Sequence, residues 1–117
     1  MERINVLGTE YFVETHKVSE DSYLKENNLA GYCDEAEKLI VVADMSEKRF
    51  FELDEKAQKL YKRKVLRHEI IHAFLNESGL SNNSLSPDSW AKNEEMIDWF
   101  AIQSPKIFAI FTQLHIL

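Results

Sequence analysis

The spacing of two histidines and one glutamate constrains the fold of this chain more than any other sequence feature. His68, Glu69 and His72 form the pattern His-Glu-x-x-His, and the residues around it are mostly apolar. Residues four apart lie one turn apart on the same face of an α-helix, so the two imidazoles can point at one metal ion. The pattern is typical of a zinc-binding helix whose glutamate acts as a general base without binding the metal. We therefore expect a helix here, buried on its apolar side behind a zinc site.

The alternative to a zinc site is a core helix whose two histidines only form hydrogen bonds. A catalytic zinc needs a third protein ligand and keeps its fourth position for water. In metzincins a glycine and then a third histidine follow the motif, but Leu75 and Ser78 occupy those positions here. The metzincin pattern is therefore excluded, and a third ligand must come from another part of the chain.

Two carboxylates further along the chain have the spacing that a third ligand and its support need. Glu94 and Asp98 are four residues apart, so they share one face of a predicted helix. We expect Glu94 to bind the metal and Asp98 to accept a hydrogen bond from the far nitrogen of a ligand histidine, which fixes the orientation of that ring. Glu95 points elsewhere by about 100° and is the second choice as ligand. The alternative is that these acidic residues form a solvated helix face.

The composition places the site in a soluble globular protein. The chain has 117 residues, of which 44% are hydrophobic, as expected of a single domain with a core. The net charge of -6 argues against direct binding to nucleic acid. Cys33 is the only cysteine, so no intrachain disulfide can form, which suits a reducing compartment. Neither a signal peptide nor a membrane-spanning run is apparent, and we expect a cytoplasmic protein without membrane contact.

Hydrophobic periodicity predicts strands first and helices later. The predicted elements are a strand or helix start at 3–7, a strand at 10–18, a hairpin with arms at 29–34 and 38–43, and helices at about 53–78, 90–103 and 106–115. The second hairpin arm is one apolar run, which suggests that both its faces are covered. Ser104 and Pro105 are typical of a helix start and predict a boundary there. The last helix either completes the core or exposes an apolar stripe.

These elements predict an α+β fold in one domain, residues 1–117. We expect a small zincin-like, minimal metallopeptidase fold, in which an antiparallel sheet or hairpin packs on the motif helix and on a second helix that carries the third ligand. An edge strand of the hairpin can bind an extended peptide by main-chain hydrogen bonds, or it can be an ordinary sheet strand. The basic residues of the motif helix are expected on its exposed side: Lys62, Arg63, Lys64 and Arg67.

The motif His-Glu-x-x-His, followed by Glu-x-x-x-Asp-x-Phe-Ala, resembles the ImmA/IrrE family of gluzincin-like metallopeptidases. The resemblance covers roughly residues 30 to 103 and is closest to small members encoded by phages, prophages and other mobile elements. It implies zinc at His68, His72 and Glu94, with Glu69 as the catalytic base and Asp98 as the support for a ligand histidine. It also implies a substrate class, because family members cleave helix-turn-helix repressors at specific sites. The chain differs from many members in having Met-Ile directly after Glu95.

The expected activity is zinc-dependent hydrolysis of a peptide bond in a protein partner, such as a repressor. Glu69 would take a proton from water and pass it to the leaving amine. The transition state needs a further donor, and Tyr32, Tyr61 and His115 are chemically able. One alternative is a protein-binding module on a peptidase scaffold, in which zinc is structural and turnover is small or absent. A DNA-associated metalloprotease of the SprT type is disfavoured by the acidic charge and by the lack of a zinc-ribbon cysteine set.

Overall fold

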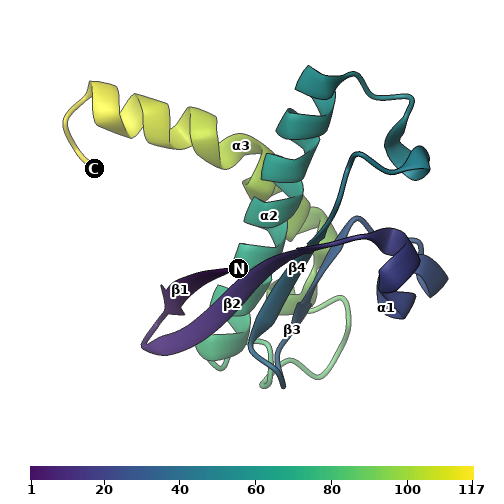
Figure 1. The fold of residues 1–117 in the computed structure, drawn as a ribbon. Coiled ribbons are helices and arrows are strands. Elements are labelled where there is room, and N and C mark those ends of the chain that lie inside the picture. Colours follow the sequence, from purple (N-terminus) through teal and green to yellow (C-terminus); the bar gives the residue numbers. More distant parts are fainter.

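The most apolar segment of the chain forms an inner strand of a four-stranded sheet (Figure 1). In the computed structural model, which describes all residues 1–117, this strand is β4 (Leu39–Ala43). Its last four residues are buried, so both faces of the strand are covered, as its continuous apolar run predicts. The strand order is β1-β2-β4-β3, and the other strands are β1 (Glu2–Val6), β2 (Thr9–His16) and β3 (Gly31–Asp34).

The sheet is mixed, which corrects the expectation of an antiparallel sheet. β1 pairs with β2, and β3 pairs with β4, in the antiparallel sense that short connections allow. β2 and β4 are parallel, with Phe12 opposite Leu39 and His16 opposite Ala43. The segment between them contains the short helix α1 (Ser22–Glu26) and β3, and it is long enough to bring the chain back to the starting end of β2. The predicted hairpin is present, and β3 is its outer arm at the edge of the sheet.

The motif lies on one long helix, α2 (Glu55–Glu77), which packs against the sheet. The helix begins after Asp54, whose side chain accepts a hydrogen bond from the backbone N–H of Ala57. Beyond its end, Gly79 has a φ of 84°, a left-handed conformation that glycine adopts without strain. Buried side chains of β4, β1 and α2 form the core between helix and sheet.

The helix that carries Glu94 and Asp98, α3 (Glu94–Gln113), runs through Pro105 without a break. The predicted boundary at Ser104 and Pro105 is therefore wrong. Pro105 has no N–H with which to bind the carbonyl oxygen of Ala101, one turn earlier. The guanidinium of Arg67 on α2 donates to that oxygen instead, and the distance from Nε to the oxygen is 2.6 Å. Because the carbonyl has a partner from another helix, α3 continues past the proline.

The last part of α3 leaves the body of the molecule and projects to one side (Figure 1). Its side chains are mostly exposed, so the stripe is exposed and does not complete the core. We refer to residues 106–117 as the α3 arm. Short 3-10 helices connect the main elements at Val18–Glu20, Lys48–Phe50 and Trp90–Lys92. None of the helices combines the length and the apolar character that crossing a bilayer requires.

Candidate metal centre

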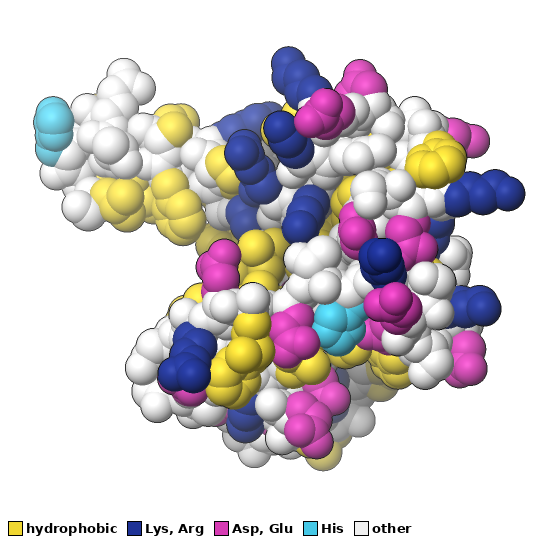
Figure 2. Space-filling view, in the orientation of Figure 1, with side chains coloured by type: hydrophobic (Ala, Val, Ile, Leu, Met, Phe, Trp, Pro, Cys, Tyr) yellow, Lys and Arg dark blue, Asp and Glu magenta, His cyan; other side chains and the backbone are white.

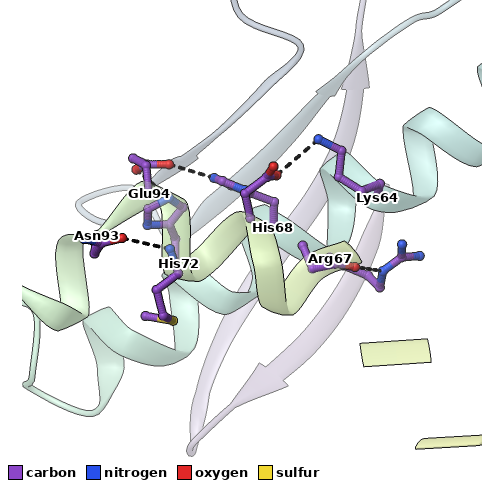
Figure 3. Close-up of polar contacts among 9 residues, drawn as sticks. Lys64, Arg67, His68, His72, Asn93 and Glu94 are labelled. Atoms are coloured by element: carbon purple, nitrogen blue, oxygen red, sulfur yellow. Dashed lines mark hydrogen bonds and ion pairs between the residues drawn. The ribbon is translucent and has the colours of Figure 1, made fainter. Parts of the chain in front are cut away.

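Three side chains from two helices converge at the start of α3 (Figure 3). His68 and His72 lie on α2, and Glu94 lies in the first turn of α3. Nε2 of His68 is 2.9 Å from Oε2 of Glu94, and Nε2 of His72 is 3.0 Å from Oε1 of the same carboxylate. One ligand atom from each residue lies within 4.8 Å of the other two, so this group can hold a metal ion.

The position of Glu94 follows from the way α3 begins. Asn93 precedes the helix, and its side-chain oxygen accepts a hydrogen bond from the backbone N–H of Met96. This cap fixes the first turn, from which Glu94 points towards the two histidines. Glu95, the second choice from the sequence, lines a different surface together with Trp90 and Trp99. Of the two glutamates, only Glu94 belongs to the group with the histidines.

Asp98 contacts the far side of a histidine ring. Its Oδ1 is 3.2 Å from Nδ1 of His68, while Nε2 of that ring faces Glu94. Nζ of Lys64 lies 3.1 Å from the same Oδ1. Burial raises the pKa of Asp98, but Lys64 and His68 outweigh burial and hold the pKa below its usual value. The carboxylate is therefore ionised at neutral pH and can keep the ring of His68 in one orientation.

The donor chemistry suits zinc. Two imidazole nitrogens and one carboxylate are a common set of three protein ligands at a catalytic zinc. Burial lowers the pKa of His72, although the charge of Glu94 opposes this effect. A lowered pKa favours the neutral ring, which is the form that binds metals. The residues present therefore fit a divalent metal of this type.

Glu69 is a buried carboxyl group next to the three candidate ligands. Only 8% of the surface of Glu69 is exposed. Burial raises its pKa to about 7; the charge of Glu94 adds to this rise, while His68 and Lys64 oppose it. A group with a pKa near the working pH can both accept and return a proton. A divalent cation on the neighbouring ligands would lower this pKa again, because positive charge favours the carboxylate.

The candidate ligands and Glu69 line a cleft of about 450 Å³ that also borders the edge strand. Gly31 at the start of β3 allows this strand to lie very close to α2. A Cβ at this position would be 2.7 Å from Cγ1 of Val65 and 2.8 Å from the carbonyl oxygen of Val41. Only a residue without a side chain fits there. β3 therefore forms one wall of the cleft, directly beside Glu69.

The three side chains that the sequence suggested as hydrogen-bond donors for the transition state do not point at the candidate metal ligands His68, His72 and Glu94. Tyr32 lines the cleft, but its hydroxyl donates to Oδ2 of Asp21 over 2.7 Å. Tyr61 packs against Phe50 and lies outside the residues that line the cleft. His115 belongs to the α3 arm and is exposed. The sequence offered suitable chemistry at these positions but no information about where they point.

Two residues that the sequence reasoning missed lie on the same face of α2 as the histidines. Lys64, His68, His72 and Asn76 follow one another at intervals of four, which is the signal that could have identified them. Lys64 was expected to face solvent, but it pairs with Asp98. Asn76 lines the cleft, where its amide nitrogen makes a long contact of 3.9 Å with the sulfur of Cys33.

Cys33 borders the cleft without the properties of a nucleophile. Burial raises the pKa of its thiol to about 12, and the nearby charge of Glu69 adds to this rise. The thiol therefore stays protonated at neutral pH, and thiolate is the reactive form of cysteine.

No protein-family model, curated protein or solved structure matches this chain. The chemistry of the cleft therefore carries the functional conclusion.

Proposed function

We propose that this protein is a zinc-dependent metallo-endopeptidase. His68, His72 and Glu94 would hold the metal, and Glu69 would be the general base. One observation carries the proposal: the three candidate ligands and a buried carboxyl group share a cleft that runs along an edge strand. A structural metal site does not need a separate carboxyl group that is poised to exchange protons.

The residues of the cleft divide the work of peptide hydrolysis among them. Zinc, when bound, supplies a Lewis acid that activates water and polarises the peptide carbonyl. Glu69 accepts a proton from the attacking water and later gives it to the leaving amine. Asp98 keeps the ring of His68 oriented through the contact with Nδ1. Asn76 can donate a hydrogen bond to a carbonyl of a peptide in the cleft, because its amide group has only the long contact with sulfur.

The edge strand suggests what kind of substrate the cleft takes. β3 pairs with β4 on one side only, so its outer side presents main-chain groups that are free to pair. An extended segment of another protein can add to this edge and pass the candidate metal group. The resemblance to the ImmA/IrrE family suggests a helix-turn-helix repressor of a phage or mobile element as that protein.

The test combines metal content with cleavage. We expect the purified chain to bind one zinc ion, measured by elemental analysis after dialysis. His68→Ala and Glu94→Ala should lose it, whereas the matched control Glu95→Ala should keep it. Glu69→Gln should also keep zinc, because it retains the size of the side chain and removes only the base. Its cleavage of a peptide library, read by mass spectrometry, should fall by about 10²–10⁴-fold.

Two results would contradict parts of this proposal in different ways. If Glu95→Ala loses the metal and Glu94→Ala keeps it, the ligand assignment is wrong. If Glu69→Gln cleaves as fast as the wild type, the role of the base is wrong. The wild-type protein could also bind zinc but cleave neither a peptide of the library nor a repressor encoded beside its gene. That result would favour the protein-binding alternative.

A further inference from the structure

The molecule exposes more surface than a folded monomer of its mass should. Its accessible surface is 8031 Å². The relation between mass and surface for monomeric proteins gives about 6,600 Å² for 13.7 kDa, so the excess is about 1,400 Å². The radius of gyration is 15.1 Å, against about 13 Å expected for 117 residues. The projecting α3 arm accounts for this shape (Figure 1).

The α3 arm carries apolar side chains that nothing in the chain covers. Ile110 is 56% exposed and Leu114 is 59% exposed, although both are large hydrophobic residues. The last acidic residue of the chain is Asp98, so the arm of this acidic protein carries no negative side chain. Exposed apolar surface of this extent marks an interaction site in a folded protein.

An apolar groove of about 480 Å³ lies where the arm leaves the body. The hydrophobic lining residues that the body contributes include Ile70, Ile71, Phe74, Met96 and Phe100, and Phe108 at the base of the arm closes one end. The one charged residue in its wall, Arg67, is engaged with the carbonyl oxygen of Ala101. Figure 2 shows hydrophobic side chains on the arm and, across the hollow beneath it, on the body. The arm and the groove therefore have the same apolar, nearly uncharged character.

We propose that two copies of the chain form a dimer in which each α3 arm lies in the apolar groove of the other copy. Such a pair has two-fold symmetry and closes, because each chain gives its arm to the other and receives the other's arm in return. A standard interface removes about 800 Å² from each partner, and the excess surface of about 1,400 Å² exceeds that need. Two chains of net charge -6 repel each other, but they meet here at surfaces without acidic residues. A second copy covers arm and groove together.

The mass of the full chain in solution tests the dimer. Sedimentation velocity on the purified protein should give twice 13.7 kDa at micromolar concentration. Ile110→Glu or Leu114→Glu in the arm, and Phe74→Lys in the groove, should each raise the dissociation constant by about 30-fold or more. Leu85→Glu is the matched control, because Leu85 is fully exposed in a loop and should not affect the mass. Circular dichroism and zinc content should be unchanged in the arm variants, so this proposal and the proposed function fail separately.

Mixing two variants tests where the arm lies. Ile110→Glu pairs poorly with itself, and so does Phe74→Lys, because each homodimer has two altered contacts. A mixed pair keeps one native arm-in-groove contact and places the new acidic group opposite the new basic one. The mixture should therefore recover the dimer mass. The proposal is overturned if the wild-type chain stays monomeric at a concentration of about 0.1 mM, because its dissociation constant would then be weaker than that value. This holds even if the chain binds lipid vesicles or another protein. Failure of the mixture to recover would also overturn it.

Discussion

At the scale of single residues, Gly31 decides how closely the edge strand approaches the motif helix. The missing side chain leaves no free space, because an added Cβ would lie 2.8 Å from the backbone oxygen of Val41. A backbone atom inside a sheet cannot move aside without loss of strand pairing. The width of the cleft therefore depends on a residue that has no chemistry of its own.

We predict that Gly31→Ala lowers the free energy of unfolding by about 1–3 kcal/mol, the usual cost of overpacking. The physical reason is the double clash with the oxygen of Val41 and with Cγ1 of Val65. Urea denaturation followed by circular dichroism measures the change. Val65→Ala removes one of the two clashing atoms, so the double variant should be more stable than the sum of the single changes predicts. Additive changes would contradict the prediction.

At the site, the sequence predicted most of what depends on spacing along one helix. His68 and His72 had to share a face, as did Glu94 and Asp98, and both pairs do so. The sequence could not show that Lys64 reaches Asp98, because this contact depends on how α2 and α3 pack. Nor could it show that the hydroxyl of Tyr32 donates to Asp21, because this contact depends on how β3 lies against the start of α1.

At the scale of elements, Arg67 and Pro105 explain why α3 is one helix. The proline removes a hydrogen bond within α3, and the arginine on α2 supplies a donor to the freed oxygen of Ala101. A buried carbonyl without a partner costs about 1–3 kcal/mol. The contact therefore connects the two helices at the point where the arm begins.

We predict that Arg67→Leu lowers the free energy of unfolding by about 1–3 kcal/mol in the natural background. In the background of Pro105→Ala the cost should be smaller, because the alanine restores an N–H that can bind the carbonyl oxygen of Ala101. A double-mutant cycle from guanidinium denaturation gives the coupling, expected at about 1 kcal/mol. Equal costs in both backgrounds would show that the arginine acts independently of the proline.

The elements themselves were predicted where their signals are local. The hairpin of β3 and β4 and the long helix α2 follow from periodicity, and both are present. The parallel pairing of β2 with β4 was not predicted, because neither strand carries a signal for a partner so distant in the chain. The helix boundary at Pro105 was wrong because its compensation comes from Arg67, on another helix.

At the scale of the whole molecule, α2 serves two surfaces. One face carries His68 and His72 into the cleft, and another carries Ile71 and Phe74 into the apolar groove. No residue lines both. Changes in the groove therefore test association without altering any side chain of the cleft.

The sheet order also has a consequence for the kinetics of folding. The β3–β4 pair is local and lies against α2, whereas β2 can join β4 only after α1 and β3 have been passed. Contacts between neighbouring segments form at a lower entropic cost and tend to form first. We infer that the hairpin of β3 and β4 forms first and that β2, with β1 paired to it, joins β4 later.

We predict that Val41→Ala on β4 slows folding, whereas Val6→Ala on β1 mainly speeds unfolding. Both valines are fully buried, so both changes should destabilise the protein enough for a reliable comparison. Stopped-flow folding and unfolding in urea measures the two rates, and the opposite assignment would contradict the inferred order. Because β3 is also one wall of the cleft, a chain that folds in this order forms that wall before its sheet is complete.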